Sequence, residues 1–196
     1  MRQQRLFLFA HGAGAPSASA WMQAWRARLT TLGDVVAFDY PYMKTGRRLP
    51  DRQPALIAAH VQALAEARAH ASGPVFLIGK SMGSRIGCHV ALEAAVSGVI
   101  CLGYPLVSGT SGALRDEVLL ALRTPILFVQ GTGDPLCPLD KLQAVRERMQ
   151  TRHELFVVTG GNHSLEISRA RTKRDAQEAS NAAVLAAIRR FVESIA

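Results

Sequence analysis

The chain has 196 residues, of which 48% are hydrophobic and 19% are charged, and its formal net charge is +8. This composition excludes an intrinsically disordered chain, which would contain fewer hydrophobic residues, and the length fits a single domain over residues 1–196. No apolar run approaches the roughly 18 residues of a membrane-spanning helix, so we expect no membrane partner.

Short apolar runs alternate with segments of helical periodicity along the chain. The predicted strands lie at residues 5–10, 35–38, 74–78, 99–102, 126–129 and 154–158. The predicted helices lie within residues 22–32, 56–64, 84–92, 139–149 and 184–195. Continuously apolar strands separated by helices indicate an α/β fold, with a mostly parallel sheet of about six strands and helices on both faces. In such sheets, ligands bind beyond the carboxyl ends of the strands.

The first predicted strand also has some features of a secretory signal. Arg2 and Arg5 precede the apolar residues 6–10, and residues 17–20 resemble a cleavage site. However, His11 and Gly12 interrupt the apolar stretch after five residues, and the apolar part of a signal peptide has about 7–15. We therefore interpret this segment as a buried strand and expect a cytoplasmic protein.

The sequence Gly-Lys-Ser-Met-Gly at residues 79–83 lies between the third predicted strand and the following helix. A serine between glycines at a sharp strand-to-helix turn has an exposed hydroxyl and a strained backbone. Glycines suit such a turn because a Cβ would crowd it. The pattern is not decisive alone in a chain with 16 glycines, but its position makes Ser81 the candidate nucleophile.

A serine hydroxyl needs a base, and six histidines are available. Three lie in helical patterns, where a hydrogen-bonded or solvated ring is the simpler interpretation: His60, His70 and His89. His153 precedes the last strand and so lies at the opposite edge of the sheet, whereas His11 follows the first strand at the correct edge. His163 follows the last strand among small residues that leave its ring free to reach Ser81, and is therefore the best candidate base.

The base in turn needs an acid that fixes its tautomer. Asp134 comes directly after the fifth strand, and the loop after the fourth strand, residues 103–112, contains no acidic residue. Asp140 begins the next helix, where a carboxylate complements the helix dipole, and Asp39 precedes the serine in the chain. Asp134 is the candidate acid, with a simple turn residue in a Gly-Asp-Pro segment as the alternative.

A tetrahedral intermediate needs donors for its oxyanion. The backbone N–H of Met82 begins a helix, and Ala13 lies in the glycine-rich loop after the first strand; we predict that these two groups form the oxyanion hole. The same loop could be a phosphate cradle, but it lacks the Lys-Ser/Thr ending of a P-loop and the glycine pattern of a dinucleotide site.

Cysteine and charge patterns point to no further site. Cys88, Cys101 and Cys137 have neither disulfide nor metal-ligand spacing, so we expect core thiols, no metal and no cofactor. Basic residues cluster at positions 169–174 and at Arg189 and Arg190. We interpret them as a solvated surface and do not expect a nucleic-acid partner, because no zinc-finger or aromatic RNA-binding motif accompanies them.

The order serine, aspartate, histidine, each after a strand, resembles the α/β-hydrolase superfamily over essentially the whole chain. Within it, residues 11–14, 38–42, 79–85 and 162–165 resemble the small KANL3/Tex30-like hydrolase group. The resemblance implies Ser81 as nucleophile, Asp134 as acid and His163 as base, and it implies no substrate. Lys80 departs from the common superfamily pattern, in which an aromatic residue or histidine often precedes the serine.

Two interpretations of Lys80 remain: it tunes the site toward anionic substrates, or it points into solvent, which we favour. Only about 20 residues separate the fourth and fifth strands, so we expect no large lid domain and an open site. The predicted function is a serine hydrolase that cleaves esters or thioesters of small soluble acyl substrates through an acyl-enzyme. The alternative is a non-catalytic interaction module with the same fold.

Overall fold

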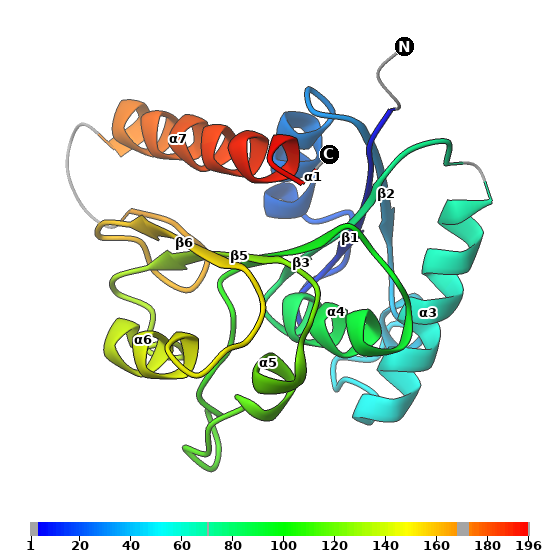
Figure 1. The fold of residues 1–196 in the computed structure, drawn as a ribbon, viewed down its shortest axis with the longest axis horizontal. Helices are drawn as coiled ribbons and strands as arrows, with labels where there is room; N and C mark the ends of the chain where they lie inside the picture. The colour runs from blue at the N-terminus through cyan, green and yellow to red at the C-terminus, as the bar shows by residue number, and fades with distance from the viewer. Residues whose placement is uncertain (1–3, 70, 168–172, 196) are drawn as a thin grey trace.

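In a computed structural model, which describes residues 4–69, 71–167 and 173–195, the strands form one sheet in which every neighbouring pair is parallel (Figure 1). The order across the sheet is β2-β1-β3-β4-β5-β6. The strands are β1 (Leu6–Ala10), β2 (Asp34–Phe38), β3 (Val75–Lys80), β4 (Gly98–Leu102), β5 (Ile126–Gly131) and β6 (His153–Val158). The predicted parallel α/β sheet of about six strands is confirmed.

Helices cover both faces of this sheet, as predicted (Figure 1). They are α1 (Ala20–Leu29), α2 (Pro41–Lys44), α3 (Gln53–Arg68), α4 (Met82–Glu93), α5 (Glu117–Ala121), α6 (Leu139–Arg146) and α7 (Lys173–Glu193). Only the short helix α5 lies between β4 and β5, which confirms the absence of a large lid domain. Within the described parts of the chain, no helix is both long and apolar enough to span a membrane.

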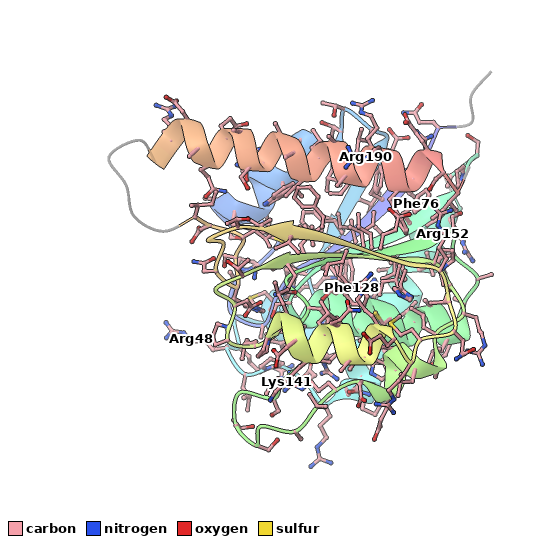
Figure 2. All side chains as sticks on the ribbon, turned by 60° about the vertical axis from the view of Figure 1, so that its left-hand side comes forward. Arg48, Phe76, Phe128, Lys141, Arg152 and Arg190 are labelled. Atoms are coloured by element: carbon pink, nitrogen blue, oxygen red, sulfur yellow. The ribbon has the colours of Figure 1, made fainter. Side chains whose placement is uncertain are left out.

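The strands are continuously apolar because both sheet faces are buried. Alternate residues point to opposite faces, so Phe7 and Phe9 pack in a cluster with α1 and α7, whereas Leu6 and Leu8 pack in a cluster with α3 and α4. A third cluster, on the same face as α3 and α4, joins β4 and β5 to α5 and α6. Figure 2 shows this division through Phe76 on the α7 side and Phe128 on the α6 side.

Two strands extend beyond the apolar runs that predicted them. β3 continues to Lys80, which pairs with Leu102, and β5 continues through Gln130 to Gly131, which pairs with Val158. The sequence pattern stops where the side chains become polar, but the ladder of backbone hydrogen bonds does not. These polar strand ends therefore sit at the carboxyl edge of the sheet.

Several of the basic residues noted in the sequence lie on α7. Arg189 and Arg190 are exposed on α7, and Figure 2 labels Arg190. Residues 169–172 of the basic cluster, like His70, lie outside the described residues. The absence of a nucleic-acid partner stays a prediction.

The fold also buries a neutral histidine. His60 on α3 is completely buried against the Phe38 ring, and its Nδ1 atom lies 3.1 Å from the Tyr40 hydroxyl. Burial lowers the pKa of His60 to about 3, whereas an exposed histidine titrates near about 6.5. The unfolded chain therefore binds a proton below about pH 6.5 that the folded chain does not bind, and the free energy of unfolding should fall on acidification.

Urea unfolding at pH 7 and pH 5 checks this expectation. We expect the His60 contribution to approach about 1.4 kcal/mol for each pH unit below about 6.5, and the variant His60→Asn should lose it. His11 and His89, whose pKa values burial also lowers, should leave a smaller acid sensitivity in that variant. Equal losses of stability in the wild type and the variant would contradict the prediction.

Candidate active site

Ser81 occupies a strained turn between β3 and α4. Its φ is 50°, a left-handed value that a residue with a side chain adopts only at a cost. A Cβ on Gly79 would lie 2.2 Å from the Ser84 nitrogen, and one on Gly83 would lie 2.5 Å from the Ala10 carbonyl oxygen. The crowding expected from the sequence is therefore present, and only glycine fits at either position.

Three loops bring Ser81, His163 and Asp134 together at the carboxyl edge of the sheet. His163 Nε2 lies 2.8 Å from Ser81 Oγ, and His163 Nδ1 lies 2.7 Å from Asp134 Oδ2. The hydroxyl, imidazole and carboxylate thus form one hydrogen-bonded chain. The loops follow β3, β6 and β5, three strands whose carboxyl ends meet at one edge because the sheet is parallel.

The carboxylate of Asp134 is buried and accepts hydrogen bonds from three donors. Besides His163, the Leu136 N–H donates to Oδ1 at 2.9 Å and the Gln130 side-chain amide donates to Oδ2. Burial alone would raise the pKa of Asp134, but the hydrogen bond and charge of His163, with these two donors, hold the pKa below its ordinary value. Asp134 therefore stays ionised beside the imidazole.

Gln130 was not predicted from the sequence. Its Oε1 accepts the Tyr104 backbone N–H at 3.0 Å, and this contact directs the Gln130 amide nitrogen toward Asp134. The signal available in the sequence was a polar residue directly after the apolar residues 126–129, and the structure buries this residue completely. The apolar pattern places the end of this strand at Val129, one residue before Gln130.

The backbone of His163 is held from two sides. Lys80 Nζ donates to the His163 carbonyl oxygen, and Gly103, with φ +70°, approaches so closely that a Cβ there would lie 2.5 Å from the same oxygen. The expectation that Lys80 points into solvent is wrong: its side chain is half-buried and lines the cavity beside Ser81. The strand pattern could not reveal this, because the carbonyl that holds Lys80 belongs to a distant loop.

The two predicted oxyanion donors flank the serine. Met82 follows Ser81 as the first residue of α4, and Ala13 lines the same cavity as Ser81. Within the described residues, the N–H groups of Met82 and Ala13 have no protein acceptor. The Tyr42 hydroxyl donates to the Ala13 carbonyl oxygen at 3.0 Å and so helps to fix this loop.

A cavity of about 400 Å³ opens beside Ser81. It is bounded by the loop after β1, by α1 and by the loops after β5 and β6, and its lining includes Ala13, Trp21, Lys80, Leu136 and His163. The indole N–H of Trp21 donates to the Ser164 carbonyl oxygen at 2.9 Å, which fixes the ring in the wall. The cavity combines apolar walls with the Ser81 hydroxyl, the Lys80 ammonium group and, at its rim, the Glu166 carboxylate.

The remaining candidates do not reach Ser81. His11 is completely buried, with Nδ1 2.6 Å from the Gly12 carbonyl oxygen and Nε2 accepting the Tyr40 N–H. Asp39 accepts the Ser17 N–H at 2.6 Å, and Asp140 is exposed in the first turn of α6.

All three cysteines are free and buried, as predicted. Burial raises the pKa of Cys137 to about 12, so this thiol stays protonated near neutral pH. Among the residues that the structure describes, no group of three or more His, Cys, Asp or Glu side chains is placed to hold a metal ion.

Comparison with known proteins gives the same architecture. The model of a family described as "Alpha/beta hydrolase domain" matches residues 3–193. An alpha-beta serine hydrolase homologue from Coxiella burnetii has a TM-score of 0.75 and 18% identity, covering 97% of this chain and 86% of that chain. The dienelactone hydrolase from Anabaena variabilis has a TM-score of 0.67 and 20% identity, covering 91% of this chain and 85% of that chain.

A third similar structure is the RedJ thioesterase of the prodiginine biosynthetic pathway in Streptomyces coelicolor. Its TM-score is 0.65 and its identity is 18%, with 97% of this chain and 91% of that chain covered. At such identities the likeness concerns the fold. The family match is broader than the KANL3/Tex30-like group and does not distinguish that group from its relatives.

Proposed function

Because the chain belongs to the alpha/beta hydrolase domain family, we propose that it is a serine hydrolase that cleaves esters or thioesters of small soluble acyl substrates. Ser81 is the nucleophile, His163 the general base and Asp134 the acid that orients it. The observation that carries this proposal is the hydrogen-bonded chain, with 2.8 Å from Ser81 Oγ to His163 Nε2 and 2.7 Å from His163 Nδ1 to Asp134 Oδ2.

The ionised carboxylate selects the reactive tautomer of the imidazole. The Asp134 carboxylate accepts a hydrogen bond from the N–H at His163 Nδ1, which leaves Nε2 unprotonated and free to accept the Ser81 hydroxyl proton. Ser81 Oγ then attacks the acyl carbon, and the negative charge that develops on the acyl oxygen is stabilised by the N–H groups of Ala13 and Met82. His163 returns the proton to the leaving oxygen or sulfur, and an acyl-enzyme remains.

Hydrolysis of the acyl-enzyme repeats these steps with water. His163 Nε2 takes a proton from a water molecule, whose oxygen attacks the acyl carbon. The second tetrahedral intermediate collapses, the proton passes to Ser81 Oγ and the carboxylic acid leaves. The same oxyanion donors serve both halves of the reaction.

Two features support small soluble substrates. The cavity of about 400 Å³ holds a short acyl chain, and the connection from β4 to β5 contains only α5, with no lid domain to cover a lipid chain. Among proteins of similar fold, one is named a dienelactone hydrolase and another a thioesterase, which is in keeping with either an oxygen or a sulfur leaving group.

Labelling with a fluorophosphonate probe tests the proposal. The probe reacts with activated serines, so we expect one equivalent of label on the folded protein, on the peptide that contains Ser81, and none after heat denaturation. Hydrolysis of short 4-nitrophenyl esters and thioesters should accompany the labelling. A folded protein that neither reacts with the probe nor cleaves these substrates would instead be a non-catalytic interaction module with a hydrolase fold.

A further inference from the structure

The proposed reaction leaves the ammonium group of Lys80 unused. Lys80 is the last residue of β3, directly before Ser81, and its side chain lines the cavity that would hold the acyl group. Apolar neighbours desolvate this charge: burial lowers the pKa of Lys80 to about 8, against the opposing influence of the Asp134 and Glu166 carboxylates. At neutral pH the group still carries its proton.

The ammonium has spare hydrogen-bonding capacity. Of its three N–H donors, one contacts the His163 carbonyl oxygen, and Nζ lies 5.5 Å from the centroid of the Trp21 ring. Within the described residues Lys80 forms no ion pair. The charge is therefore half-buried, next to the nucleophile and without a counter-ion.

Neither nearby carboxylate forms a direct ion pair with Lys80. The oxygens of Asp134 accept hydrogen bonds from His163, Gln130 and Leu136. Glu166 is exposed at the cavity rim, where its carboxylate accepts the Asn162 amide at 3.3 Å. An anionic group entering with the substrate would supply the direct ion pair that Lys80 lacks.

We propose that Lys80 makes this site selective for esters whose acyl part ends in a carboxylate. This inference rests on the proposed function and specifies its substrate class. The acyl chain lies along the apolar wall near Trp21 and Leu136, and its terminal carboxylate accepts the free N–H donors of Lys80. A charge-assisted hydrogen bond in a site of low polarity is stronger than a neutral one, which favours the anionic substrate over a neutral chain of equal length.

A matched pair of substrates tests this selectivity. The mono-4-nitrophenyl ester of adipic acid carries a terminal carboxylate, and 4-nitrophenyl hexanoate has the same number of carbon atoms in a neutral acyl chain. After subtraction of spontaneous hydrolysis, we expect the wild type to show a kcat/KM ratio of about ten or more in favour of the adipate ester. Lys80→Met and the more polar Lys80→Gln should lower that ratio to about one or below, and Lys80→Arg should keep a preference for the anion.

The ratio of kcat/KM between the two esters distinguishes a Lys80 that binds the substrate carboxylate from a Lys80 that only positions the His163 backbone. If Lys80 only held the His163 backbone, both esters would lose activity equally in Lys80→Met and the ratio would stay at its wild-type value, which would overturn the inference. The control Lys141→Met removes an equal charge from an exposed position on α6 (Figure 2) and should leave the ratio unchanged. Turnover of both esters without any preference in the wild type would overturn the inference alone, whereas no turnover of either ester would overturn the proposed function itself.

Discussion

Replacement of Ser81 by alanine should lower kcat for short nitrophenyl esters by about four to six orders of magnitude, with little change in KM. Removal of Oγ removes the atom that forms the acyl-enzyme, and His163 Nε2 loses its hydrogen-bond partner. The oxyanion donors and the cavity remain, so a small residual acceleration over water should persist. Steady-state kinetics with purified variant and wild type give the comparison.

The fold should tolerate this change. Alanine and serine both carry a Cβ, so the left-handed backbone at position 81 costs the same in either chain. The urea midpoint should therefore stay close to that of the wild type. Ser111→Ala, in the exposed loop after β4, is the matched control and should keep full activity. Retention of more than about one hundredth of the wild-type kcat in Ser81→Ala would exclude Ser81 as the nucleophile.

The variant Asp134→Asn should lower kcat/KM by about four orders of magnitude. Three hydrogen-bond donors converge on the carboxylate, and two of them cannot become acceptors. The Leu136 N–H belongs to the backbone, and the Gln130 amide is held in its orientation by the Tyr104 N–H. An amide has one acceptor oxygen, so it cannot satisfy all three. Where the amide N–H faces His163, the imidazole must carry its proton on Nε2, the atom that has to accept the serine proton.

Asp140→Asn provides the matched control for this variant. Asp140 is an exposed aspartate in the first turn of α6, and its replacement should leave kcat/KM within about twofold of the wild type. The Asp134→Asn chain should remain folded, with a lower urea midpoint because buried donors lose an acceptor. A loss of less than about tenfold in kcat/KM would show that Asp134 does not orient the base.

The convergence of Ser81, Asp134 and His163 was predictable because it depends on topology. Each residue follows a strand, and a parallel sheet brings the carboxyl ends of its strands to one edge. No knowledge of side-chain packing was needed for that step. The fold class followed from the same alternation of apolar strands and helices.

Packing between distant segments could not be predicted in this way. Lys80 meets the carbonyl of His163, which is 83 positions away in the chain, and Gln130 is oriented by the backbone of the loop after β4. Helices α2 and α5 were also missed, because elements of four and five residues are too short to show helical periodicity. The sequence predicted which groups meet at the site, and the structure adds the contacts that hold them.

Two of the tightly packed glycines, Gly83 and Gly103, have a consequence for redesign of this site. Gly83 abuts the carbonyls that end β1, and Gly103 abuts the carbonyl of His163, so any larger residue at either position would push apart the segments that bear Ser81 and His163. Libraries intended to broaden substrate range should keep both codons fixed. A Cβ on Gly14, by contrast, would meet no other atom within 4 Å although Gly14 lines the cavity beside Ser81, and this is the natural first position for diversification.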